Sequence, residues 1–103
     1  MREIDIDQVA DALQQGLPVI DVREREEYVS GHVPGVVHIA MGHLPGRLEE
    51  IDRSGPVYLI CASGNRSGAM TDLLVAAGFD AVNVAGGTTA WARSGRPLEQ
   101  APR

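Results

Sequence analysis

The sequence predicts an α/β domain with a central, mainly parallel sheet that helices cover on both faces. Strand and helix patterns alternate along the 103 residues, and several of the strand segments are apolar throughout, as strands buried on both faces are. By the usual size of domains, residues 1–103 are expected to form one domain. In such sheets ligands bind beyond the carboxyl ends of the strands, so candidate site residues are expected there.

The expected elements follow from apolar spacing and from turn residues. In chain order they are a helix in 4–16, a strand in 18–22, a helix in 23–31, a Pro-Gly turn and strand in 32–40, a short helix in 44–52, a strand in 55–61, a helix that ends at Gly78, a strand and turn in 79–87, and a helix in 88–95. The residues alone thus predict four strands, of which 55–61 is the most central.

Two of the helices carry clear signals. The first has Asp5 as its expected N-cap, with Gln8 three positions later, an arrangement typical of a capping box, and Gly16 as its end. The helix after residue 61 has Met70, Leu73, Leu74 and Ala77 at positions i, i+3, i+4 and i+7. This spacing places an apolar stripe on one face, which is expected to pack on the sheet.

Composition and charge exclude several classes of protein. The net charge is −5, and the nine basic residues are scattered arginines, so the sequence has no basic patch for nucleic acid. No segment is apolar enough to cross a membrane, and the charged start "MREIDIDQ" lacks the apolar stretch of a secretion signal. With a single cysteine no internal disulfide is possible, which favours a reducing compartment, and we expect a cytoplasmic protein.

The segment "CASGNRS", residues 61–67, is the strongest candidate for a functional site. Cys61 stands where the central strand ends, and Ala62, Ser63, Gly64 and Asn65 are residue types that allow a tight turn with exposed N–H groups. Such a ring of amides, together with the positive end of the following helix, is expected to stabilise a thiolate.

Arg66 and Ser67 complete the segment. Arg66 adds a permanent planar cation that can form a two-pronged contact with an oxyanion. A lone cysteine at a strand end is more often a small core residue. The combination of strand, cysteine, turn, arginine and helix start nevertheless favours a functional role for Cys61.

The chain closely resembles the rhodanese-like family of sulfurtransferases. The loop "CASGNRS" is similar to the family pattern Cys-x-x-Gly-x-Arg-Ser, and "VIDVRE", "EYVSGHVPGVVHI" and "VAGGTTAW" resemble three further family segments, in the family's order, between residues 19 and 91. Val36 stands where the family more often has Ala. The resemblance implies a five-stranded, largely parallel sheet.

The resemblance also implies the chemistry. Cys61 would take a sulfur atom from a donor such as thiosulfate and hold it as a persulfide. A thiol, cyanide or a sulfur-accepting protein would then collect that sulfur. The loop residues would surround the outer sulfur, and no cofactor is expected. Asp21 and Arg23 resemble the family's buried polar pair and are interpreted as supports, with Glu27 as an expected partner of Arg23.

Two other functions remain open at this point. A cysteine-dependent phosphatase also uses a loop between a cysteine and an arginine, but its loop has five intervening residues, whereas four separate Cys61 from Arg66. A relay module that passes sulfur between proteins, with little activity on free thiosulfate, is the second alternative. His32, His38 and His43 are spaced by six and five positions and do not predict a metal site.

Overall fold

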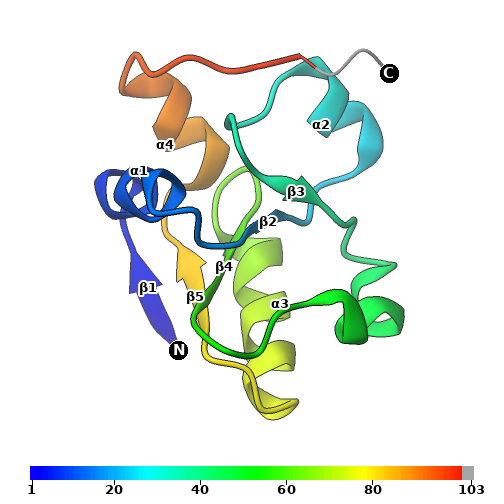
Figure 1. Ribbon diagram of the computed structural model, residues 1–103. Helices are drawn as coiled ribbons and strands as arrows, with labels where there is room; N and C mark the ends of the chain where they lie inside the picture. The colour runs from blue at the N-terminus through cyan, green and yellow to red at the C-terminus, as the bar shows by residue number, and fades with distance from the viewer. Residues whose placement is uncertain (101–103) are drawn as a thin grey trace.

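The computed structural model describes residues 1–100, and within them five strands form one sheet in which every neighbouring pair is parallel (Figure 1). The strand order is β1-β5-β4-β2-β3. The strands are β1 (Arg2–Ile4), β2 (Val19–Asp21), β3 (Val37–His38), β4 (Val57–Ile60) and β5 (Ala81–Val84). The predicted α/β fold is confirmed, and β4 occupies the centre of the sheet, as its apolar sequence indicated.

Within residues 1–100, three α-helices and one 3-10 segment connect the strands, and a fourth α-helix follows β5. They are α1 (Ile6–Gln14), α2 (Arg25–Ser30), η1 (Leu44–Glu50), α3 (Asn65–Ala76) and α4 (Gly87–Arg93). Asp5 is the N-cap of α1: its side chain accepts from the amide of Gln8, while the Gln8 side chain accepts from the amide of Asp5. The predicted capping box is therefore present. The short helix expected in 44–52 is instead the 3-10 segment η1.

The residue pattern alone missed the first strand. Residues 4–16 were predicted as one helix and nothing was predicted before them, whereas Ile4 belongs to β1, which pairs with β5 at the edge of the sheet. Three residues are too short to show a period of two, and Arg2 and Glu3 are exposed. Pairing with β5 forms this strand, and its own sequence gives no signal for it.

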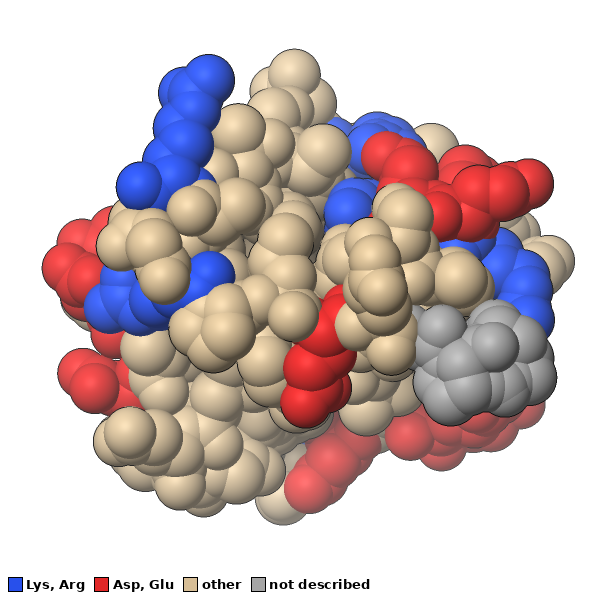
Figure 2. All heavy atoms as spheres, turned by 90° about the horizontal axis from the view of Figure 1, so that it is seen from above, with Lys and Arg blue, Asp and Glu red and all other residues tan. Residues whose placement is uncertain are grey.

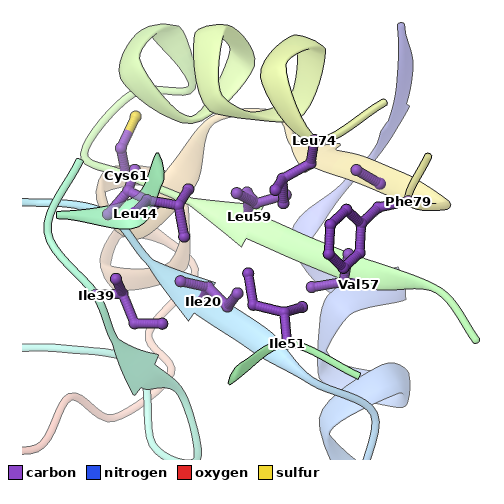
Figure 3. Close-up of a cluster of buried hydrophobic side chains, with 11 residues drawn as sticks. Ile20, Ile39, Leu44, Ile51, Val57, Leu59, Cys61, Leu74 and Phe79 are labelled. Carbon is purple, nitrogen blue, oxygen red and sulfur yellow. The ribbon is translucent and has the colours of Figure 1, made fainter. Parts of the chain in front are cut away.

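The core has two halves, one on each face of the sheet. In one half α3 and η1 cover the sheet, and the close-up in Figure 3 shows apolar side chains of both packing on β2 and β4. The other half contains Val9 of α1 and Trp91 of α4. Trp91 is 6% exposed, and its indole N–H donates to the carbonyl of Pro97 at 2.8 Å. Trp91 therefore anchors α4 in this half of the core.

The carboxyl ends of the strands all lie at one end of the molecule, at the top of Figure 1, where β4 leads into the loop before α3. Figure 2 looks down on this end and shows acidic and basic side chains lying together toward the right-hand side. None of the helices in residues 1–100 has both the length and the apolar character needed to cross a bilayer.

Candidate active site

Cys61 follows the last residue of β4 and lies at the border of the core. Its side chain belongs to the same apolar cluster as Leu44 and Leu59, and Figure 3 shows its sulfur pointing away from these side chains. The residue is only 1% exposed. The loop of residues 62–67 therefore covers the sulfur, and the chemistry of the thiol depends on what that loop presents to it.

The loop presents hydrogen-bond donors to the sulfur. The amide of Gly64 donates to Cys61 Sγ at 3.1 Å, and the hydroxyl of Ser67, which is fully buried, donates to the same atom at 3.3 Å. Gly64 can aim its amide in this way because its φ is 107°, a left-handed conformation that side chains rarely adopt. Of the loop amides expected to point inward, that of Gly64 is hydrogen-bonded to the sulfur, and Gly64 is the one residue of segment 61–67 with a positive φ.

The hydrogen-bond donors change the pKa of the Cys61 thiol more than burial does. Burial raises the pKa of the Cys61 thiol, because it disfavours the charged form. The Ser67 hydroxyl and the backbone amides of Ser67, Gly64 and Ser63 lower it further than burial raises it, so the pKa lies below its ordinary value. The loop therefore lowers the pKa of this thiol through hydrogen-bond donors, which is the direction that the sequence predicted.

Asn83 of β5 holds the loop from below. Its side-chain amide donates to the carbonyl of Gly64 at 3.1 Å and to Glu3 Oε2 of β1 at 2.9 Å. Asn83 is 1% exposed, and sequence analysis did not select it as a site residue. A polar residue within the apolar strand pattern "AVNV" was the available signal.

The start of α4 holds the loop from the side. The amides of Thr88 and Thr89 donate to the carbonyls of Cys61 and Ala62, at 2.9 and 3.0 Å. This approach requires Gly87, which has a φ of 59° and lies so close that a methyl group there would collide with the Cys61 carbonyl oxygen and lie 2.7 Å from that of Ala62. The two glycines of "VAGGTTAW" were the signal for this contact.

Arg66 does not offer a free guanidinium. Its Nη1 and Nη2 donate to the two carboxylate oxygens of Glu27, at 2.7 and 2.9 Å. The hydrogen bond from Arg66 lowers the pKa of Glu27 from 4.5 to about 2, and Glu27 in turn raises the pKa of Arg66. The expectation that Glu27 pairs with Arg23 is wrong, because Glu27 reaches across to the loop.

Arg23 pairs instead with Asp21 inside the protein. The Arg23 Nε and Nη2 donate to the Asp21 carboxylate at 2.9 to 3.1 Å, and Nη2 also donates to the carbonyl of Gly31 at 2.8 Å. Both side chains are more than nine-tenths buried. The predicted buried pair is present, and since Asp21 lies beside Ile60 in the sheet register, it adjoins the strand that carries Cys61.

The remaining predicted residues lie on the outside of the loop. The side chains of Ser63 and Asn65 are exposed, and Ala62 is half-buried. Ala62 also borders a surface groove of about 370 Å³ whose lining includes Arg23, Thr88 and Arg93. The backbone of the loop therefore faces the sulfur, while several of its side chains face solvent.

His32 and His38 are engaged in structural contacts. Their rings stack on the two sides of Tyr28, with centroid distances of 3.9 and 4.5 Å. His32 Nδ1 lies 2.8 Å from the carbonyl of Tyr28, and His38 Nε2 lies 2.7 Å from that of Arg23. The rings of His32 and His38 are therefore both within hydrogen-bonding distance of backbone carbonyls, and His43 is exposed.

Comparisons with known proteins agree with this geometry. The family model described as "Rhodanese-like domain" matches residues 5–94. A Bacillus subtilis (strain 168) protein named "Putative sulfurtransferase YtwF" is 43% identical over 81 residues, which are 79% of this chain and 79% of that protein. A second protein of that strain, "Putative sulfur carrier protein YrkF", is 41% identical over 78 residues, which cover 75% of this chain but 42% of the relative.

Solved structures show the same fold. The crystal structure of a rhodanese-related protein from Thermoplasma volcanium superposes with a TM-score of 0.90 at 29% identity, over 98% of this chain and 100% of the other. The family match, the relatives and the cysteine loop at the end of the central strand agree with one another. The names of the two relatives support a role in sulfur transfer. The chain belongs to the rhodanese-like domain family.

Proposed function

We propose that this chain transfers sulfane sulfur through a persulfide on Cys61. The observation that carries the proposal is the set of donors on Cys61 Sγ, from the Gly64 amide and the Ser67 hydroxyl. These donors stabilise the thiolate, which is the nucleophilic form of cysteine. Donors fixed in place before the reaction also stabilise charge without reorganisation, so they suit a sulfur that alternates between thiolate and persulfide.

The transfer occurs in two displacement steps. In the first, the Cys61 thiolate attacks the outer sulfur of the donor, a new S–S bond forms, and the bond that held that sulfur in the donor breaks. Thiosulfate would release sulfite with the bonding electron pair, and an organic persulfide would release a thiolate. In the second, a thiolate or cyanide attacks the outer sulfur of the Cys61 persulfide. Cys61 leaves as a thiolate, so no cofactor or external oxidant is consumed.

Burial of Cys61 suits the intermediate. A persulfide decays by reaction with other thiols and oxidants, and a sulfur covered by one layer of loop residues is protected from them. Because Cys61 is 1% exposed, the loop residues that cover the sulfur must move for a donor to reach it. A reducing compartment such as the cytoplasm would keep this single thiol free.

A phosphatase function has less support. Four residues separate Cys61 from Arg66, and the small ring of donors is filled by a single sulfur. The two terminal nitrogens of Arg66 bind Glu27, so they are not presented to a phosphate.

Intact-protein mass spectrometry tests the proposal. The chain is incubated with thiosulfate or with an organic persulfide, and we expect the mass to increase by one sulfur atom that cyanide or a thiol removes. The Cys61→Ser variant should gain no sulfur, because a hydroxyl of similar size is almost un-ionised at neutral pH. A gain of sulfur by the serine variant, or no gain by the wild type with either donor, would contradict the proposal.

A further inference from the structure

The ion pair between Glu27 and Arg66 joins helix α2 to the cysteine loop. Both nitrogens of the Arg66 fork are used, each by a different oxygen of Glu27. Glu27 is fixed from its other side as well, because its Oε1 accepts from the backbone amide of Glu24 at 3.0 Å in the capping box of α2. The side chains of Arg66 and Glu27 are 33% and 37% exposed. The pair is therefore ordered and lies at the boundary with solvent.

This pair changes what the loop offers to a donor. Arg66 is the only charged residue in segment 61–67, so it is the loop's one cation for a sulfonate. A guanidinium binds such a group best through two parallel N–H donors, and Glu27 occupies those two. A donor with a sulfonate end must displace the carboxylate or approach its negative charge. The amide ring around Cys61 acts on the sulfur atom alone and does not depend on Arg66.

Neighbouring arginines do not replace this cation within the ring. Arg23 is buried and binds Asp21 and the Gly31 carbonyl. Arg93 lines the groove beside Ala62 and is exposed. Arg93 keeps its charge in the wild type and in every variant described below, so its effect on thiosulfate binding is the same in all of them.

We propose that Glu27 determines the donor preference of Cys61, by occupying the Arg66 fork so that sulfonate-bearing inorganic donors such as thiosulfate are disfavoured and organic persulfides are favoured. The inference rests on the proposed persulfide chemistry. In the favoured step the Cys61 thiolate attacks the outer sulfur of R–S–SH, giving Cys61–S–SH and R–S⁻. The sulfane sulfur moves without net oxidation, and its carbon-bearing end needs no cation.

The test measures how fast each of two sulfur donors converts Cys61 to its persulfide in three proteins: the wild type and two variants. Thiosulfate represents the sulfonate class and 2-hydroxyethyl persulfide, whose carbon end is uncharged, represents the organic class. The variant is Glu27→Gln, which keeps the length of the side chain and can still cap α2. The matched control is Glu26→Gln, the same charge change on the same helix at an exposed residue with no hydrogen bond to the loop.

We expect Glu27→Gln to lower the half-saturating concentration of thiosulfate about tenfold, as removal of one nearby partly screened charge should. The maximal rate of loading should stay the same, since the donors on Cys61 are untouched. Loading by 2-hydroxyethyl persulfide should change less than about twofold. Glu26→Gln should leave both donors as in the wild type. A structural effect of Glu27 would instead change the maximal rates for both donors together.

An unchanged or higher half-saturating concentration of thiosulfate in Glu27→Gln, with wild-type loading by the organic persulfide, would overturn this inference and leave the proposed function intact. If the wild type takes sulfur from neither donor, the proposed function itself fails, and this inference fails with it. Thermal unfolding establishes that each variant is folded. If Glu27→Gln is not folded, Glu27→Ala replaces it, because it also frees the guanidinium of Arg66. The same results for thiosulfate and for the organic persulfide then decide the inference.

Discussion

The hydroxyl of Ser67 offers a direct test of how the loop stabilises the Cys61 thiolate. It is fully buried and donates to Cys61 Sγ at 3.3 Å. In Ser67→Ala the donor is lost while the volume of the side chain changes little, and the amides of Gly64 and Ser67 remain. Because burial of Cys61 opposes ionisation, the loss should raise the pKa of the thiol.

The size of the effect follows from the hydrogen bond. A bond to a charged acceptor contributes about 1.5 kcal/mol or more. A loss of about 1.4 kcal/mol reduces the fraction of thiolate about tenfold at any pH below the midpoint. The alkylation rate of Cys61 at such a pH should fall by a similar factor.

The assay is a pH titration of the ultraviolet absorbance of the thiolate. The chain has one cysteine, so the signal belongs to Cys61, and burial raises the pKa of Tyr28, which keeps its ionisation at higher pH. The control is Ser63→Ala, which removes an exposed hydroxyl and keeps the backbone amide. A midpoint in Ser67→Ala that equals the wild type, or lies below it, would refute the view that this hydroxyl stabilises the anion.

Three further outcomes concern stability. The pKa of Glu27 is lowered from 4.5 to about 2 in the folded chain, so its ion pair stabilises the fold above pH 4.5 and this contribution is lost as the pH falls toward 2. For a pair about one-third exposed we expect about 1 kcal/mol after solvent screening, and chemical unfolding of Glu27→Gln and wild type at neutral and acid pH should show the difference disappearing. Gly87→Ala should destabilise the chain by about 3 kcal/mol from collision and left-handed strain together. Gly95 has a φ of 86°, and no atom lies within 4 Å of where its Cβ would be, so Gly95→Ala should lower the free energy of unfolding by only about 1 kcal/mol, from the left-handed strain. Equal losses of stability in the two variants would contradict the view that Gly87 is needed for the close contact with the loop. Asn83→Ala should cost about 1 kcal/mol and speed hydrogen exchange at the Gly64 amide, whereas unchanged exchange would show that Asn83 does not hold the loop.

The sequence predicted the backbone course of residues 61–67 because the signals for it are local. Cys61 follows an apolar strand, and the turn residues and the helix stripe follow directly. The strand end, the turn at Gly64 and the inward amides are all consequences of neighbours in the chain. Asp21 and Arg23, which lie two residues apart, form the buried pair that the resemblance to the family implied.

The sequence failed where a contact joins distant segments. Arg66 and Glu27 are 39 positions apart, and several other carboxylates could have met that guanidinium. The expected pairing of Glu27 with Arg23 came from the resemblance to the family. In the structure this pair does not form, because Arg23 precedes α2 and turns inward to Asp21. Strand β1 was missed for the same reason, because it lies at the start of the chain and its partner β5 lies near the other end.

The contact of Thr88 and Thr89 with the carbonyls of Cys61 and Ala62 also bears on synthesis at the ribosome. A nascent chain that has just exposed its thiol still lacks β5 and α4, so neither Asn83 nor the two threonine amides can brace the loop. The loop is therefore held on both sides only after β5 and the start of α4 have left the exit tunnel. On the proposed function, a chain that still lacks β5 and α4 is therefore expected to load sulfur less readily than one that has both elements.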